Sequence, residues 1–210
     1  MDLKDIKLEY IREELNQKDL NKDPIQQIQK WFKEAQISEI SYPNAVTLAT
    51  VNKHGIPSTR IVLIKEITND GIIFFTDYTS QKGIDLECNN NVSILFFWKE
   101  LDRQIRISGL ATKLSKEDSK EYFYTRSRDA QISALASNQS SAVSKEELVS
   151  RVKSINKEFE GKEIKFPETW GGYIVSYNSF EFWQGRPNRL HDRFQYEKKT
   201  ENWNIQRLSP

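Results

Sequence analysis

Short β-forming segments separated by turn residues fill the chain from residue 45 to residue 114, and they restrict the possible folds. Turns as short as 52–55 and 69–71 favour antiparallel pairing of the strands that they join. A second group of β-forming segments lies near the end of the chain. The expected strands are Ala45–Val51, Thr59–Ile67, Ile72–Thr76, Val92–Trp98, Gln104–Leu114, Gly172–Ser176, Phe180–Gln184, Asp192–Glu197 and Trp203–Arg207.

Helix signals precede and interrupt these strands. Leu8, Ile11 and Leu15 recur at helical spacing, and Asp23-Pro24 combines a capping residue with proline at the first helical position. Further helices are expected over Ser80–Glu87, from the capping box at Ser115 through Tyr124, and from Ser144 through about Phe159. This order predicts an α+β fold built on an antiparallel sheet or barrel, and it disfavours a doubly wound parallel sheet.

Composition excludes several classes of function. The 31 Lys and Arg residues nearly cancel the 30 Asp and Glu residues, so a broad basic surface for nucleic acid is not expected. The longest apolar run, Ile94–Trp98, is far too short to cross a membrane. A single cysteine, Cys88, excludes an internal disulfide and a cysteine-based zinc site, and this cysteine usage fits the cytoplasm. Only two histidines leave little room for a histidine-rich metal site.

Arg60 and Lys65 enclose four aliphatic residues in an expected buried strand. A buried cation needs a carboxylate or an anionic ligand, whereas a cation at an exposed strand end needs neither, and the pattern leaves both interpretations open. Residues five apart face opposite sides of a regular strand, so the two cations are expected to serve different groups.

Two further segments have the composition of phosphate sites. Thr76–Lys82 follows a strand, enters a helix and carries hydroxyl groups and a lysine. Tyr122 and Arg126 are four residues apart on one helix face, where a phenol and a guanidinium could share a phosphate. An ordinary connecting loop and a solvated tyrosine–arginine pair are the alternatives.

The segment Phe182–Arg193 is the most informative. If residues 189–193 are extended, Arg189, His191 and Arg193 project from one face, and their mutual repulsion lowers the pKa of the histidine unless an anion lies among them. Trp183 in the preceding strand adds an aromatic wall, so the segment suits a planar anionic ligand. A charged edge strand is the alternative.

The polar run Ser137–Ser141 offers amide and hydroxyl groups that could bind a heterocycle, or it is simply a loop. Neither of the two common glycine-rich nucleotide-binding motifs occurs in the chain. Taken together, the cation clusters favour a phosphate-bearing cofactor and a phosphorylated substrate.

Five motifs make the chain resemble the pyridoxine/pyridoxamine 5'-phosphate oxidase family, and the similarity runs from Glu9-Tyr10 to the last residue. The motifs are RIVLIK (60–65), RQIRISG (103–109), NQSS (138–141), WGGY (170–173) and FWQGRPNRLHDRF (182–194). The resemblance implies an FMN-binding split β-barrel, antiparallel and Greek-key-like, with peripheral helices. It also implies an N-terminal helical lid segment over 1–20 and a single domain over 21–210.

The resemblance further implies a homodimer with FMN in clefts between the subunits. The implied reaction oxidises pyridoxamine or pyridoxine 5'-phosphate to pyridoxal 5'-phosphate, with dioxygen as acceptor and hydrogen peroxide as product. The cofactor-binding residues that it implies are Arg60, Ile61, Val62, Leu63, Ile64, Lys65, Phe75, Thr76, Lys82, Gln104, Gln139, Ser140, Trp183 and Arg193, of which Gln139-Ser140 would come from the other subunit.

The substrate-binding residues implied by the resemblance are Lys7, Tyr10, Lys65, Tyr122, Arg126, Arg189, Leu190 and His191. Of these, Arg189 and His191 would be catalytic by placing the pyridine ring against the flavin, and Lys65, Tyr122 and Arg126 would bind the substrate phosphate. No metal is implied.

Four positions depart from the family pattern. Gln81 replaces an arginine, Ala130 a serine, Tyr42 an aspartate and Lys7 an arginine. These departures motivate the alternative of a non-catalytic protein that binds FMN or pyridoxal phosphate, and a related flavin reductase is a third possibility.

Overall fold

The computed structural model describes residue 10, residues 14–200 and residues 202–210. The α-helices of this part of the chain are α1 (Pro24–Ile37), α2 (Gln81–Cys88), α3 (Lys116–Thr125), α4 (Arg128–Ala136) and α5 (Lys145–Glu158). Its strands are β1 (Ala45–Val51), β2 (Pro57–Ile67), β3 (Ile72–Asp77), β4 (Asn91–Trp98), β5 (Arg103–Lys113), β6 (Trp170–Gln184), β7 (Asp192–Lys199) and β8 (Asn202–Leu208). Short 3-10 turns occupy Gln17–Asp19, Lys99–Leu101 and Pro187–Arg189.

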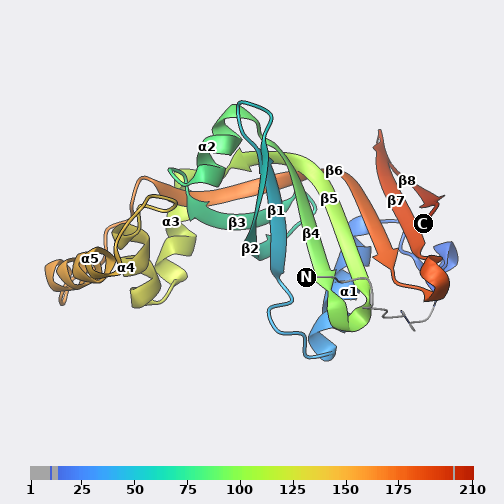
Figure 1. The fold of residues 1–210 in the computed structure, drawn as a ribbon, viewed down its shortest axis with the longest axis horizontal. Helices are drawn as coiled ribbons and strands as arrows, with labels where there is room; N and C mark the ends of the chain where they lie inside the picture. Colours follow the sequence, from blue (N-terminus) through green and yellow to red (C-terminus); the bar gives the residue numbers. More distant parts are fainter. Residues whose placement is uncertain (1–9, 11–13, 201) are drawn as a thin grey trace, which may run out of the picture.

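The strands form one antiparallel sheet that closes on itself. Their order is β3-β2-β1-β4-β5-β6, and an additional pairing of β3 with β6 closes a six-stranded barrel. Strands β7 and β8 extend the sheet beyond β6 (Figure 1). The expected α+β split barrel is thereby confirmed.

Strand β6 is where the barrel opens into this extension. Its first part, 170–175, pairs with β3, and its last part, 179–184, pairs with β7. The sequence predicted two separate strands here, but β5 pairs with β6 along its whole length and holds the two parts together. The register of that pairing shifts between Ser108 and Gly109.

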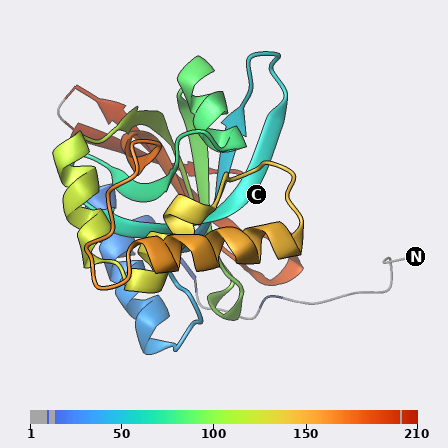
Figure 2. The ribbon, with the colours of Figure 1, turned by 90° about the vertical axis from the view of Figure 1, so that its left-hand side faces the viewer.

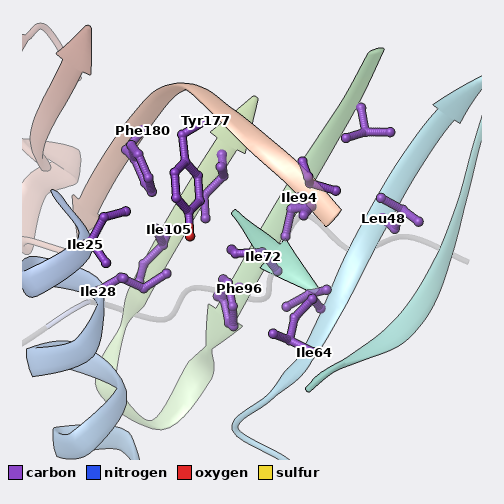
Figure 3. Close-up of a cluster of buried hydrophobic side chains, with 14 of the residues drawn as sticks. Ile25, Ile28, Leu48, Ile64, Ile72, Ile94, Phe96, Ile105, Tyr177 and Phe180 are labelled. Carbon is purple, nitrogen blue, oxygen red and sulfur yellow. The ribbon is translucent and has the colours of Figure 1, made fainter. Parts of the chain in front are cut away.

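The main hydrophobic core fills the barrel. Leu48 on β1, Ile72 on β3, and Ile94 and Phe96 on β4 are all fully buried. Helix α1 covers one open end, where Ile28 is also fully buried (Figure 3). The expected start of α1 is confirmed, because the Asp23 side chain accepts a hydrogen bond from the Ile25 N–H.

The N-terminal helix prediction falls mainly on residues 1–9 and 11–13, which lie outside the described residues together with Lys7. Residues 14–16 are not helical, and only Gln17–Asp19 forms a 3-10 turn. The Leu15 N–H donates to the Asp192 carboxylate (3.0 Å), so this segment is tied to β7 rather than to a helical turn of its own. No helix of the described residues is long and apolar enough to cross a membrane.

Helices α3, α4 and α5 form a separate layer at one end of the barrel (Figure 2). Phe123, Ile132, Phe159 and Trp170 are buried in a second hydrophobic cluster beneath them. The capping residues Ser115 and Ser144 accept hydrogen bonds from backbone N–H groups, as predicted. Helix α4 was not predicted, although the Ser127 hydroxyl caps its start in the same way.

Candidate functional site

A cleft of about 610 Å³ lies between the barrel and the helical layer. It is bounded by strands β2 and β3, the start of α2, helices α3 and α4, and the loop after α4. It brings together ten residues that the sequence singled out: Ile61, Val62, Leu63, Lys65, Phe75, Thr76, Lys82, Tyr122, Arg126 and Gln139. Of its other lining residues, Asp77, Ser127, Ser137 and Trp170 belong to segments that the sequence analysis singled out, and Ala130 is one of the departures from the family pattern. Sequence reasoning missed Ser133 and Ala134.

Lys82 lies at one end of this cleft with its ammonium group fully engaged. It donates to Gln139 Oε1 (2.9 Å), Thr76 Oγ1 (3.2 Å) and Ser80 Oγ (3.2 Å). Burial and, after it, the charge of Arg60 lower the pKa of Lys82 to about 8, and Asp77 offsets this only in part. A buried ammonium among neutral oxygen atoms is stabilised by an anion.

The loop after α4 completes this end of the cleft. Ser140 Oγ accepts a hydrogen bond from the Gln81 N–H at the first residue of α2 (3.1 Å), and Gln139 contacts Lys82 and Thr76. The family resemblance placed Gln139 and Ser140 at the other subunit's flavin. Within the described chain, Gln139 lines the cleft of its own subunit and Ser140 contacts the start of α2 beside it. Their assignment to the flavin of the other subunit stays a prediction.

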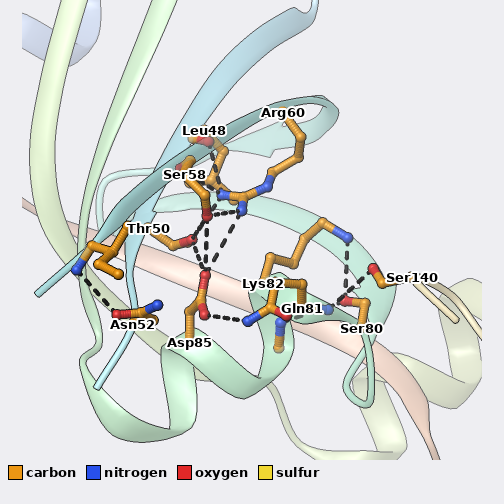
Figure 4. Close-up of polar contacts among 12 residues, drawn as sticks. Leu48, Thr50, Asn52, Ser58, Arg60, Ser80, Gln81, Lys82, Asp85 and Ser140 are labelled. Atoms are coloured by element: carbon orange, nitrogen blue, oxygen red, sulfur yellow. Dashed lines mark hydrogen bonds and ion pairs between the residues drawn. The ribbon is translucent and has the colours of Figure 1, made fainter. Parts of the chain in front are cut away.

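Arg60 lies behind the cleft wall and does not line it. Its guanidinium donates to Thr50 Oγ1 (2.8 Å) and Ser58 Oγ (2.6 Å), and it lies 3.8 Å from the carboxylate of Asp85 (Figure 4). Arg60 and the buried Ile64 therefore face inward, whereas Lys65 faces the cleft. This confirms that Arg60 and Lys65 face opposite sides of β2, and their assignment to different ligand groups stays a prediction.

Asp85 is a partner of Arg60 that sequence reasoning did not find. Its side chain is 1% exposed and also accepts from Thr50 Oγ1 (2.6 Å) and Gln81 Nε2 (2.8 Å). One signal was present in the sequence, because Asp85 shares the buried face of α2 with Lys82 and Leu86.

Arg126 lies at the other end of the cleft. Its Nη1 atom is buried and makes no hydrogen bond. Burial lowers the pKa of Arg126, and the only group that raises it is Tyr122. No carboxylate of the described residues forms an ion pair with Arg126, so its charge is available to a ligand.

The wall between these two cationic ends is apolar. Ile61 is 64% exposed and Leu63 is 40% exposed, which is unusual for aliphatic side chains of a barrel strand. A planar ring bearing phosphate fits this arrangement, with the ring against β2 and the phosphate at Lys82. The second cationic end can hold the phosphate of a second ligand.

A second group of predicted residues lies elsewhere in the chain. The His191 ring is 4.7 Å from the Trp183 ring and 5.3 Å from the Tyr10 ring, measured between centroids. Arg189 and Leu190 are exposed beside them. The premise that residues 189–193 are all extended is wrong, since Pro187–Arg189 forms a 3-10 turn in which Asn188 and Arg189 have positive φ angles of 56° and 60°.

A backbone hydrogen bond fixes the tautomer of the neutral His191 ring. The Arg186 N–H donates to His191 Nδ1 (3.1 Å), so the proton of the neutral ring lies on Nε2. Burial and then the charges of Arg189 and Arg193 lower the pKa of His191, and Asp192 opposes them only in part. The predicted direction of this shift is confirmed.

Gln104, Trp183 and Arg193 are neighbours across three adjacent strands. Gln104 is paired with Trp183, and Trp183 with Arg193. Arg193 forms an ion pair with Glu181 (2.8 Å) and donates to the Ser209 carbonyl (2.7 Å). These residues therefore form one surface beside His191.

One chain does not bring this surface to the cleft. Trp170 lies in the cleft at the start of β6, whereas Trp183 lies near its end. Thirteen residues of extended strand measure up to roughly 40 Å along the chain. The two groups of predicted site residues thus lie at opposite ends of the protomer (Figure 1).

Comparison with known families explains the joint presence of the two groups. The family model described as pyridoxamine 5'-phosphate oxidase matches residues 32–156, and the pyridoxine 5'-phosphate oxidase C-terminal dimerisation region matches residues 170–210. The chain belongs to the pyridoxamine 5'-phosphate oxidase family. The second group, Trp183 to Arg193, falls within its dimerisation region.

Relatives cover the whole chain. The pyridoxine/pyridoxamine 5'-phosphate oxidase of Leptospira biflexa is 50% identical over 100% of this chain and 99% of its own length. Pyridoxine/pyridoxamine 5'-phosphate oxidase 2 of Hydrogenovibrio crunogenus is 44% identical over the same shares. The present chain is therefore an enzyme, an oxidoreductase of this family.

Solved structures agree with the fold. PhzG from Burkholderia lata, in complex with tetrahydrophenazine-1-carboxylic acid, has a TM-score of 0.86 and 30% identity, covering 92% of this chain and 95% of its own. An FMN-binding, pyridoxamine 5'-phosphate oxidase-related protein of Nostoc punctiforme has a TM-score of 0.72 and 16% identity, covering 91% of this chain and 100% of its own, which shows the fold alone.

The departures from the family pattern can now be placed. Ala130 lines the cleft near Arg126, so a hydroxyl group is missing there. Gln81 turns toward Asp85 and does not line the cleft. Tyr42 is 74% exposed and also lies outside the cleft lining.

Proposed function

We propose that this enzyme is an FMN-dependent oxidase that converts pyridoxamine 5'-phosphate and pyridoxine 5'-phosphate to pyridoxal 5'-phosphate. Pyridoxine 5'-phosphate loses two electrons and two protons to dioxygen, which becomes hydrogen peroxide. With pyridoxamine 5'-phosphate, water also enters and ammonia leaves. The observation that carries the proposal is a single cleft with cations at both ends and an apolar wall between them.

The cleft fits FMN at the Lys82 end. Lys82, Thr76 and the start of α2 would bind the phosphate, with Gln139 and Ser140 beside them. FMN, when bound, supplies the two-electron acceptor for the reaction. Ile61 and Leu63 would support the flat ring, and Arg60 would add positive charge from behind the wall.

The substrate fits at the Arg126 end. Lys65, Tyr122 and Arg126 would bind its phosphate through charge and directional hydrogen bonds. Arg189 and His191 would hold the pyridine ring. Since Nδ1 of His191 already accepts a hydrogen bond, its Nε2–H would donate to the substrate and fix the orientation of the ring.

A homodimer is required for this assignment. In the proposed dimer, the Trp183–Arg193 surface of one subunit covers the cleft of its partner, and Gln104, Trp183 and Arg193 contact the flavin there. The subunit contact would also bury exposed apolar residues on the barrel strands. These residues are Ile61, Leu63, Phe97 and Leu110.

A second candidate follows from the match to PhzG, whose ligand is a tricyclic acid without phosphate. In that case the cationic end at Arg126 would hold a carboxylate. A comparison of substrates separates the two candidates. If the first candidate is right, a phosphorylated vitamer should be oxidised. Its unphosphorylated form should then react far more slowly, because Lys65 and Arg126 would lack a partner.

One experiment tests the proposed function directly. The purified protein should show the absorbance of bound flavin, and anaerobic pyridoxamine 5'-phosphate should bleach it. Admission of dioxygen should restore the colour and release hydrogen peroxide. Stable colour without bleaching would instead support a non-catalytic binding protein.

Lys65→Ala should raise the KM for pyridoxamine 5'-phosphate by about 10- to 100-fold, because one charge-assisted contact of about 1.5–3 kcal/mol is lost. Steady-state peroxide release measures this. Lys116, which pairs with Glu168 on the surface, provides a matched control as Lys116→Ala, with no expected change in KM. An unchanged KM for Lys65→Ala would place the substrate phosphate elsewhere.

The affinity for FMN should fall as the pH rises above about 8, which is the pKa of Lys82 in the free protein. The phosphate binds the ammonium form, so above this pH binding must take up a proton and weakens by up to about tenfold per pH unit. Quenching of flavin fluorescence measures the affinity. Lys82→Arg should remove the slope, and a slope that persists in this variant would assign it to another group.

A further inference from the structure

Trp170 has no role in the function proposed above, although it begins the WGGY segment and lines the cleft. The guanidinium carbon of Arg126 lies 4.7 Å from the centroid of the Trp170 ring. This is the geometry of a cation–π contact, and tryptophan is the strongest aromatic partner for such a contact. Trp170 is only 7% exposed, so the contact is shielded from water.

The contact takes the place of an acidic partner. Most buried arginines pair with a carboxylate, which fixes the guanidinium but neutralises it. The face of Trp170 also fixes the guanidinium, yet it carries no net charge. Arg126 can thus remain oriented and cationic, with its Nη1 atom unsatisfied until an anion arrives.

Trp170 itself is held by a stack of rings. Phe75 stacks on Tyr122 with a centroid distance of 3.8 Å, and Trp170 lies nearly parallel to both, at 5.4 Å and 6.2 Å. Phe75 comes from β3, Tyr122 from α3 and Trp170 from β6. The stack therefore fixes the position of α3, and with it Arg126, against the barrel.

Gly171, the residue after Trp170, leaves room for α3 to approach this closely. A Cβ atom on Gly171 would lie 2.1 Å from the Tyr78 hydroxyl and 2.8 Å from Ser119 Oγ. The Gly172 N–H donates to the same Ser119 hydroxyl (3.1 Å). Any side chain at Gly171 would therefore clash first with the Tyr78 ring and then with Ser119 on α3, the helix that carries Tyr122 and ends at Arg126.

We propose that Trp170 is a positioning residue that determines selectivity for phosphorylated substrates by orienting Arg126 without neutralising it. The inference rests on the proposed function, since it assigns the substrate phosphate to Arg126. It predicts that the role of Trp170 depends on Arg126 and on the phosphate of the ligand.

The test compares Trp170→Leu and Trp170→Phe in the flavin-loaded enzyme. Trp170→Leu should raise the KM for pyridoxamine 5'-phosphate about 5- to 30-fold, with most of the loss in KM rather than kcat. Trp170→Phe keeps a ring and should show a smaller rise, so it serves if the leucine variant does not fold. Trp203→Leu, on β8, is the matched control and should leave this KM unchanged.

A double-mutant cycle separates positioning from general damage. In an Arg126→Met background, Trp170→Leu should add less than about twofold to the KM, because the pair acts as a unit. The reaction with unphosphorylated pyridoxamine should also be insensitive to Trp170→Leu. An equal loss in the Arg126→Met background, or an equal loss with pyridoxamine, would overturn the inference.

Titration with inorganic phosphate gives a readout that needs no turnover. Calorimetry should show phosphate binding to the wild-type protein and about 5- to 30-fold weaker binding to Trp170→Leu. If the wild-type protein binds phosphate in this way but oxidises no vitamer, the proposed function fails and the role of Trp170 stands. If phosphate binds both proteins equally, the role of Trp170 fails whatever the activity.

Discussion

A one-to-one mixture of Arg126→Ala and Arg189→Ala subunits should recover about a quarter of the wild-type activity, although each variant alone is nearly inactive. Random exchange makes half of the dimers mixed, and each mixed dimer contains one cleft in which both arginines are intact. The expectation follows from the position of Arg126 in the cleft and of Arg189 at the far end of β6 in the same chain.

Each single variant should lose roughly 100-fold or more in kcat/KM. Arg126→Ala removes the guanidinium proposed to bind the substrate phosphate, and Arg189→Ala removes a group proposed to orient the pyridine ring. Both variants should retain FMN, since neither residue belongs to the Lys82 end of the cleft. Loss of flavin from Arg189→Ala would show that its role has been misassigned.

The matched control mixes Arg126→Ala with Lys65→Ala. Both lesions lie in the same cleft, so every cleft of every dimer remains damaged, and the activity should stay at the mean of the separate variants. Subunit exchange is verified by native mass spectrometry of a tagged pair. Exchange without recovery in the Arg126→Ala and Arg189→Ala mixture would contradict a site shared between subunits.

Local hydrogen-bond signals in the sequence predicted most of the secondary structure. Strand β1 begins and ends where expected, and the helices that follow Asp23, Ser80, Ser115 and Ser144 start at those capping residues. These features depend on a few neighbouring residues. The continuity of β6 depends instead on pairing with β5, a strand about 70 residues earlier in the chain, so it could not be read locally.

Part of the candidate site could also be predicted from the sequence. Strand alternation alone predicted that Arg60 and Lys65 face opposite sides. Charge repulsion predicted the direction in which the pKa of His191 shifts, although burial, which the sequence did not reveal, is the largest cause. The left-handed backbone of Arg189 was not predictable, because it follows from the turn after Pro187 and its packing. The roles of the residues toward FMN and substrate came from family resemblance.

Asp85 shows why other site residues escape such reasoning. A single acidic residue in a short, charged helix is usually solvated. Its burial arises only because α2 packs against β1 and β2, where Thr50, Ser58 and Arg60 converge on one carboxylate. Such a network joins segments that are more than 20 residues apart. The helical spacing of Asp85 with Lys82 and Leu86 indicates a shared face, but it does not identify the partners of the carboxylate.

Asp85→Ala should lower the free energy of unfolding by about 3–5 kcal/mol, because it leaves the guanidinium of Arg60 without its carboxylate in a largely buried position. The hydroxyls of Thr50 and Ser58 and the amide of Gln81 would also lose their acceptor. Urea denaturation at one fixed protein concentration measures the change.

The matched control is Glu87→Ala on the same helix. Glu87 is exposed and pairs with Lys113 on the surface, so its loss should barely change the stability. The double variant Arg60→Leu with Asp85→Leu should regain much of the stability lost in Asp85→Ala, since neither charge then remains buried. A fully additive loss in the double variant would show that the two side chains do not act as a pair.

The effect of Asp85 should also depend on pH. Burial opposes its ionisation, but hydrogen bonds from Thr50, Gln81 and Ser58 and the charge of Arg60 outweigh burial and hold the pKa of Asp85 below its usual value. A carboxyl with a lowered pKa stabilises the fold above its unfolded pKa and loses this contribution as the pH falls through the folded pKa. The stability difference between the wild type and Asp85→Asn should therefore shrink as the pH is lowered from about 7 toward about 3. A constant difference over this range would mean that the charge of Asp85 does not contribute, and that only its hydrogen-bond geometry supports Arg60 behind the cleft.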